Sequence, residues 1–327
     1  MKKISIALLS TILFSGASAQ ASILKDGEDN FRLRGYARLG LSFAKGRSEL
    51  KNYSSRIGFD YDRAANEKIT VGAQFEWAVN MLHGSKISSS TSGDGSGTVI
   101  GNNGDFLSNR LGNLVLKTDY GTLRAGKQWS VYSEVGDWAD QFAAASGVAL
   151  GVYSYNTDGG YLGTGRADNA LTYRFEKNGL KVGLQYQAMG KDQIGSIGVN
   201  EGGYGANVIY NFMESFHVGV AYNEVKMKFA NGTGLSPRSI VAGLKFINKK
   251  FNIALAHAML KDSESSSSTL NRTTIFEEAS GTEFYFDYKF YNNFSFEVGY
   301  NLLTQKNNGN DFEKNFYLFG IKEEQTC

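Results

Sequence analysis

Apolar and polar residues alternate along most of this chain. In the stretch EKITVGAQFEWAVN at 67–80, every odd position from Ile69 to Val79 is apolar, and the even positions are mostly polar or small. A period of two predicts a β-strand with two unlike faces. Such a strand fits a sandwich in water, with a dry apolar core. It equally fits a membrane barrel, with lipid on the apolar side and a wet interior on the other.

Fourteen alternating segments follow the N-terminal region. Two of them flank Asn178-Gly179, a dipeptide that favours the tight turn of a hairpin. The segments cover 31–43, 53–63, 69–79, 107–118, 122–129, 171–175, 180–186, 202–212, 216–229, 239–247, 251–260, 282–290, 294–302 and 315–321. We therefore expect an all-β, antiparallel protein with about 14 strands.

The connections between these segments alternate in length. Tight turns at 210–215, 246–251 and 291–294 contrast with long polar loops, which are 84–104, 130–165, 190–201, 230–238, 261–281 and 304–313. Short turns at one end and long loops at the other are typical of outer-membrane barrels, whereas a soluble sandwich has no reason to segregate its loops. The pattern therefore favours lipid outside the sheet and water inside it.

Aromatic residues gather at the ends of the predicted strands. They are Phe31, Phe43, Tyr53, Tyr61, Tyr210, Phe212, Phe216, Phe246, Phe251, Phe290, Tyr291 and Phe294. The preference of aromatic residues for strands explains part of this clustering. The remainder is what an aromatic girdle at the membrane interface requires, and it supports a transmembrane β-barrel.

The N-terminal residues have the composition of a secretory signal peptide. Lys2 and Lys3 precede an apolar run at 4–14, and small residues follow at 15–19. We expect residues 1–19 to be cleaved before Gln20, which leaves one domain over 20–327. No later segment contains the roughly 18–20 apolar residues of a membrane helix.

Composition excludes several other classes of protein. A net charge of +2 argues against a nucleic-acid partner, and a single cysteine, Cys327, excludes a disulfide scaffold or a cysteine-based metal site. His83, His217 and His257 fit no catalytic or metal-binding spacing, so structural roles are expected for them. We expect no enzyme activity, no catalytic residue, no cofactor and no metal.

Four segments in order resemble the Gram-negative general diffusion porins, a family of trimeric 16-stranded channels. They read LRGYARLGLS at 33–42, SSRIGFDYD at 54–62, NRLGNLVLKTDYGTLRAGKQW at 109–129 and GRADNALTYRFEKNGLKVGLQYQ at 165–187. The resemblance implies a homotrimer in the outer membrane, in contact with lipid and lipopolysaccharide. It also implies a water-filled pore for passive diffusion of ions and small hydrophilic solutes.

In that family the third long loop folds into the barrel, and its acidic residues face a basic cluster on the wall. The corresponding loop here, 130–165, has four acids and no Lys or Arg. Alternation places arginines inside, because an Arg that faces lipid at mid-depth costs about 2–4 kcal/mol. The expected pore constriction consists of Glu134, Asp137, Asp140, Arg38, Arg56, Arg110, Arg166 and Arg174, where inward parity is clear for all the arginines except Arg110. Alternatively, the loop is exposed and the arginines have structural roles only.

The sequence departs from the family pattern in two places. The constriction loop reads FAAASG at 142–147, where the family often has Pro-Glu-Phe-Gly-Gly. The family also ends on a C-terminal aromatic residue, whereas the run at 315–321 passes here into a polar tail that ends at Cys327. Because that run is the fourteenth, we expect the last two strands of the 16-strand pattern to be missing. An assembly-impaired relative that serves as a surface adhesin or phage receptor is the alternative function.

Overall fold

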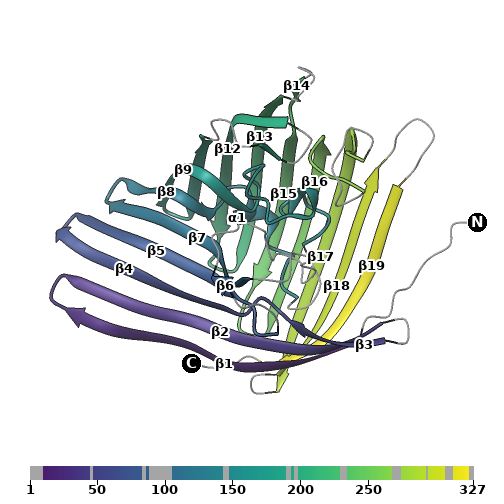
Figure 1. Ribbon diagram of the computed structural model, residues 1–327, viewed down its shortest axis with the longest axis horizontal. Helices are drawn as coiled ribbons and strands as arrows, with labels where there is room; N and C mark the ends of the chain where they lie inside the picture. The colour runs from purple at the N-terminus through teal and green to yellow at the C-terminus, as the bar shows by residue number, and fades with distance from the viewer. Residues whose placement is uncertain are drawn as a thin grey trace, which may run out of the picture.

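The protein forms one large β-sheet that curves around a short helix, α1 (Figure 1). The computed structural model describes residues 10–44, 47–82, 86–87, 105–142, 147–188, 193–194, 198–228, 234–266, 274–291, 294–305 and 312–323. None of the helices in these residues is long and apolar enough to cross a membrane. His83, most of the loop 84–104 and the tail that ends at Cys327 lie outside them.

The strands follow the alternating segments of the sequence, because each such segment buries one face and exposes the other. The first nine are β1 Ser10–Asp26, β2 Asp29–Ala44, β3 Arg47–Asn52, β4 Arg56–Asn66, β5 Ile69–Val79, β6 Lys86–Ile87, β7 Asp105–Thr118, β8 Gly121–Trp129 and β9 Arg166–Lys177. The others are β10 Leu180–Gln187, β11 Gln193–Ile194, β12 Gly198–Phe212, β13 Phe216–Lys228, β14 Gly234–Leu235, β15 Arg238–Ile247, β16 Phe251–Lys261, β17 Glu278–Tyr291, β18 Phe294–Gln305 and β19 Phe312–Glu323. The two helices are α1, Ser133–Gly136, and the 3-10 turn η1, Ser154–Asn156.

Strand pairing follows the order of the chain. Each long strand pairs antiparallel with the next, from β1–β2 through β18–β19, and only the two-residue β6 pairs in parallel, with β7. β2 pairs along one half with β3 and along the other with β4. Among the described residues, β19 pairs with β18 alone. The expected antiparallel all-β fold is confirmed.

The expected number of strands was wrong. The described residues form 19 strands, and 16 remain when the two-residue strands β6, β11 and β14 are set aside. All 14 predicted segments correspond to strands, and the two further ones are β1 and β3 near the N-terminus. The sequence RSELKN of β3 is almost wholly polar, so it carries no alternation. The total of 14 is thus corrected to 16, and the expected absence of the last two strands is not confirmed.

β1 lies partly within the expected signal peptide. Its register with β2 runs from Ser10 opposite Phe43 to Asp26 opposite Asp29. Signal cleavage before Gln20 remains a prediction, and it would remove the part of β1 that pairs with residues 35–43 of β2.

The two faces of the sheet have opposite chemistry. Large apolar side chains are exposed on the outer face, including Leu114 at 65% and Phe319 at 70% exposure. Polar side chains such as Gln185, Asn207 and Glu283 are buried at 5% exposure or less on the inner face. An outward apolar band with a polar interior is the arrangement of an outer-membrane sheet, and it answers the question left open by the alternation.

The last strand extends further than the sequence indicated. β19 continues to Glu323, two residues beyond the predicted end at Ile321. Lys322 accounts for this extension, because its ammonium group lies 2.6 Å from Asp287 and 2.9 Å from the hydroxyl of Tyr285, both on β17. A residue that the sequence placed in a polar tail thus belongs to the inner wall.

Candidate functional site

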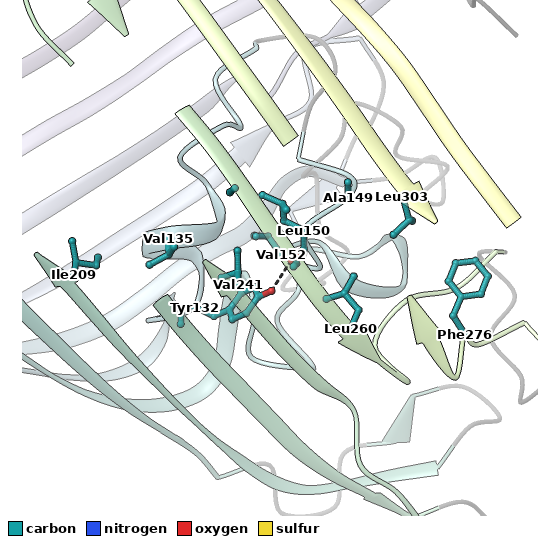
Figure 2. Close-up of a cluster of buried hydrophobic side chains, with 13 residues drawn as sticks. Tyr132, Val135, Ala149, Leu150, Val152, Ile209, Val241, Leu260, Phe276 and Leu303 are labelled. Carbon is teal, nitrogen blue, oxygen red and sulfur yellow. Dashed lines mark hydrogen bonds between the residues drawn. The ribbon is translucent and has the colours of Figure 1, made fainter. Parts of the chain in front are cut away.

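The loop at 130–165 lies on the inner face of the sheet and forms the main core of the molecule with it. Tyr132, Val135, Leu150 and Val152 of the loop are completely buried against apolar residues of β12–β18 (Figure 2). The hydroxyl of Tyr132 donates a hydrogen bond of 2.7 Å to the carbonyl oxygen of Leu150, which ties the two arms of the loop together. Residues 143–146, in the predicted FAAASG segment, lie outside the described part.

Glycines on the inner wall make room for this loop. A Cβ added at Gly219 or Gly243 would lie 2.8 Å from the ring of Trp138, and one at Gly183 would lie 2.8 Å from Val131. Since real Cβ atoms essentially never approach closer than 3.0 Å, each of these positions excludes a side chain while the loop is in place. Likewise, a Cβ added at Gly281 would lie 1.6 Å from the carbonyl oxygen of Ala149, and one at Gly299 would lie 2.4 Å from the ring of Phe142.

Amide side chains of the wall hold the loop by its backbone. Each donates a hydrogen bond to a carbonyl oxygen of the loop: Gln185 to Gly163, Gln187 to Gly160, Asn200 to Tyr161, Asn207 to Val131 and Asn223 to Leu162, at 2.7–2.8 Å. Neutral amides do not titrate, so this attachment does not depend on pH. The inward position of these residues follows from strand parity, but nothing local in the sequence shows what they bind.

The three predicted acids of the loop have different surroundings. Glu134 pairs with Arg174 and accepts a hydrogen bond of 2.7 Å from Asn207. Burial, and then the carboxylates of Asp140 and Glu283, raise the pKa of Asp137 well above its usual range. Asp140 is hydrogen-bonded to the hydroxyl of Tyr153. Glu134 is therefore neutralised by its partner, and Asp137 favours the protonated form.

The fourth acid of the loop, Asp158, belongs to a buried ion pair at the base of the loop. It lies 2.8 Å from the ammonium group of Lys127 and 3.5 Å from the guanidinium of Arg166, which is 1% exposed. Although burial alone would raise it, Arg166 and Lys127 hold the pKa of Asp158 below its ordinary value. Arg166 thus anchors the end of the loop.

The remaining predicted arginines lie on β2, β4 and β7. Arg56 and Arg110 share the carboxylate of Glu76 on β5, at 3.5 Å and 2.8 Å. Arg38 and Arg56 both stack on Tyr36, with guanidinium-to-ring distances of 4.8 Å and 4.6 Å. The structure therefore divides the five arginines into a group on β2, β4 and β7 and two separate ion pairs, Arg166–Asp158 and Arg174–Glu134.

Sequence reasoning missed the residue at the centre of that group. Glu76 is 2% exposed and pairs with Arg34 as well as with Arg56 and Arg110. Its inward parity in the segment 69–79 was visible, and so was the inward parity of Arg34. What the sequence could not show is that strand register brings three guanidinium groups to one carboxylate. The wall formed by β2, β4 and β7 thus carries more positive charge than Glu76 neutralises.

Two of the three histidines, His217 and His257, lie in the described part of the chain. Nδ1 of His217 lies 2.5 Å from the side-chain oxygen of Asn211, and Nδ1 of His257 lies 2.9 Å from Thr282. Among the described residues no three His, Cys, Asp or Glu side chains are grouped so as to hold a metal ion.

An antiparallel sheet with an exposed apolar outer face, a charged inner face and one loop packed inside it defines an outer-membrane channel protein. The family model described as "Gram-negative porin" matches residues 6–322, and the chain belongs to this family. It is thus a porin, a channel for passive diffusion located in the cell outer membrane. Porins are channels rather than enzymes.

Two curated relatives and two solved structures illustrate the similarity. The chain is 27% identical over 303 residues to outer membrane porin protein OmpD of Salmonella typhimurium, covering 87% of this chain and 74% of OmpD. It is 25% identical over 316 residues to outer membrane porin N of Escherichia coli, covering 88% and 77%. The fold is similar to Salmonella typhi OmpF, solved as a complex with daunomycin (TM-score 0.75, 21% identity, covering 94% and 89%). It is also similar to the channel DcaP of Acinetobacter baumannii (TM-score 0.61, 11% identity, covering 88% and 82%).

Proposed function

We propose that the loop at 130–165 and the arginine-bearing wall of β2, β4 and β7 form the constriction of this pore, and that ions and small hydrophilic solutes pass between them. One observation carries the proposal. The loop packs on the inner face against β12–β18, whereas Arg38, Arg56 and Arg110 belong to strands on the other side of the sheet. The loop therefore narrows the passage from one side and leaves the positive wall on the other.

Opposed charges across such a gap set a field across the passage. On the wall, the guanidinium groups of Arg34, Arg56 and Arg110 share the carboxylate of Glu76, and Arg34 also lies 3.2 Å from Asp60. On the loop, Glu134 is paired with Arg174, burial raises the pKa of Asp137, and Asp140 is hydrogen-bonded to Tyr153. This field orients water and favours small polar solutes, while apolar solutes must lose favourable hydration.

Reversal potentials under a salt gradient test this assignment. Asp140→Asn is expected to shift selectivity toward anions, and Asp137→Asn is expected to shift it much less at neutral pH. The double variant Glu201→Gln/Glu278→Gln removes two exposed acids outside the loop and serves as the control. Unchanged selectivity in Asp137→Asn/Asp140→Asn would show that the loop acids have only a structural role.

The proposal includes closure of the sheet into a barrel after signal cleavage. Removal of residues 1–19 leaves Gln20–Asp26 paired with Arg34–Asp29 and frees residues 35–43 of β2. β19 is the strand available to take their place, because its described residues pair only with β18. Arg38 on β2 interacts electrostatically with Glu297 on β18, which supports the proximity of these two edges. Closure satisfies backbone groups that would otherwise be unpaired in lipid.

Homotrimer formation is proposed from family membership. Cross-linking of the outer-membrane protein tests the homotrimer. Mass spectrometry of the N-terminal residue of the mature chain tests signal cleavage and, with it, the closure of the sheet. We expect a mature chain that begins at Gln20 and a heat-modifiable trimer band. A mature chain that retains residues 10–19 would overturn the closure scheme.

A further inference from the structure

Tyr36 lies between two arginines of the positive wall. It belongs to β2, and Arg56 of β4 is its direct partner in the register of the two strands. Arg38 follows two positions later on the same face of β2, because side chains alternate along a strand. The guanidinium carbons of Arg38 and Arg56 lie 4.8 Å and 4.6 Å from the centre of the Tyr36 ring. One aromatic ring therefore contacts two like charges.

Polar partners fix the guanidinium group of Arg56 through three of its nitrogen atoms. Nε donates a hydrogen bond of 3.2 Å to the carbonyl oxygen of Ser54, Nη2 donates one to the hydroxyl of Tyr36, and Nη1 lies 3.5 Å from Glu76. The position of Arg56 thus depends only in part on the aromatic ring.

Arg38 has fewer polar partners among the described residues. Its backbone nitrogen donates a hydrogen bond of 2.8 Å to the hydroxyl of Ser55, which fixes the main chain but not the guanidinium group. No carboxylate of the described residues lies within 4.0 Å of that group, although Glu297 on β18 interacts with it electrostatically over a longer distance. The ring of Tyr36 is therefore the side-chain contact that places the charge of Arg38.

The position of Arg38 matters because its charge is the least compensated on the wall. Three other arginines share the carboxylate of Glu76, whereas Arg38 does not. The face of an aromatic ring attracts a guanidinium group through its quadrupole, and this attraction offsets the repulsion between Arg38 and Arg56. Without the ring, repulsion from Arg56 favours rotation of Arg38 toward Glu297, whose carboxylate would neutralise it.

We propose that Tyr36 sets the ion selectivity of the pore by holding the charge of Arg38 in place on the wall. Tyr36 is a positioning residue, since it acts through the arginine and not on the solute. Anions are the class of solute whose passage this arrangement favours. The inference rests on the proposed constriction, and it adds a neutral residue on which the effect of the wall depends.

Reversal potentials under a KCl gradient test the proposal through substitutions at position 36. Tyr36→Leu is expected to shift selectivity toward cations, in the same direction as Arg38→Gln, because a cation–π contact at a partly exposed site favours the stacked position about two- to fivefold. Tyr36→Phe keeps the ring and should retain more of the wild-type selectivity than Tyr36→Leu. The control is Tyr120→Leu, which removes a ring that is 82% exposed in the turn between β7 and β8.

Fluorinated phenylalanines at position 36, introduced by nonsense suppression, separate the electrostatics of the ring from its packing. Fluorine withdraws electron density from the face of the ring with little change in size, so each added fluorine should shift selectivity further toward cations. In the Arg38→Gln background the same series should shift it much less, since the charge that the ring holds is absent. Selectivity that does not depend on fluorination, or that depends on it equally in both backgrounds, would overturn the proposal.

Arg38→Gln by itself distinguishes this inference from the proposed constriction. If the reversal potential is unchanged in Arg38→Gln, the assignment of the constriction is wrong. If Arg38→Gln shifts selectivity while Tyr36→Leu and the fluorinated series do not, the constriction stands and the role of Tyr36 is wrong.

Discussion

The contact between Trp138 and the glycine wall predicts how the loop responds to one added methyl group. In Gly243→Ala the new Cβ would lie 2.8 Å from a ring carbon of Trp138. Ordinary van der Waals contact begins near 3.4 Å, so the ring and the loop must retreat by about 0.6 Å from the wall. A retreat from this wall moves the loop toward the opposite side of the passage, and we expect single-channel conductance to fall.

The energetic cost of this change can be bounded. Overpacking of a closely packed site costs about 1–3 kcal/mol. Replacement of glycine by alanine regains about 0.4–1 kcal/mol through the unfolded chain, because alanine has fewer accessible backbone conformations. A net loss of about 0–2.6 kcal/mol, with a midpoint of about 1.3 kcal/mol, follows from these two terms, and it should lower the temperature at which the folded band converts in heat-modifiability gels.

Gly219→Ala repeats the test from the neighbouring strand. Its Cβ would also lie 2.8 Å from Trp138, so a single retreat of the ring relieves both clashes. The destabilisation in Gly219→Ala/Gly243→Ala should therefore be smaller than the sum of the single variants, as is usual for sites that share a partner.

Gly112→Ala is the control for this series. Gly112 is also in a strand, but its nearest neighbour would be an ordinary 3.8 Å from the added Cβ. We expect wild-type conductance and equal or slightly higher stability. If Gly243→Ala behaves like Gly112→Ala in both assays, or if its conductance rises, the loop does not rest on this wall as described.

Three further predictions concern single residues. Burial raises the pKa of Glu264 to about 8, so the folded state binds the proton of this carboxyl group more tightly than the unfolded state does. The resulting contribution to the free energy of unfolding is fully present below the unfolded pKa of 4.5, and it is lost as the pH rises through about 8. Glu264→Gln should flatten the fall in gel-band conversion temperature between pH 5 and 9, and an unchanged pH slope would refute this. Asn207→Leu removes hydrogen bonds to the loop backbone and to Glu134 and should cost about 1–3 kcal/mol in urea unfolding. The comparison is Asn211→Leu, whose side-chain oxygen contacts His217 and not the loop among the described residues. Glu76→Gln removes the carboxylate that pairs with buried Arg110 at 2.8 Å, which should cost about 3–5 kcal/mol and increase anion preference in reversal potentials. Unchanged selectivity would contradict the positive wall.

The sequence by itself determined the class of fold and the orientation of its faces. Alternation at period two fixes which side chains share a face whatever the partners are, so the inward position of Arg56 and Arg174 and the strand from Ile69 to Val79 could be predicted locally. The segregation of short turns from long loops was enough to favour an outer-membrane sheet. Where alternation was absent, as in β3, the prediction failed and the strand count was wrong.

Only the tertiary structure decided which inward residues meet. Register between β4, β5 and β7 brings Arg56 and Arg110 to Glu76, and no local pattern encodes a register across 20 or 34 positions of sequence. The same holds for the contact of Trp138 with Gly243, because a loop reaches the wall only through packing between segments about a hundred residues apart. Periodicity is a property of neighbouring residues, whereas the pairing of charges and the packing of the loop against the wall depend on the path of the whole chain.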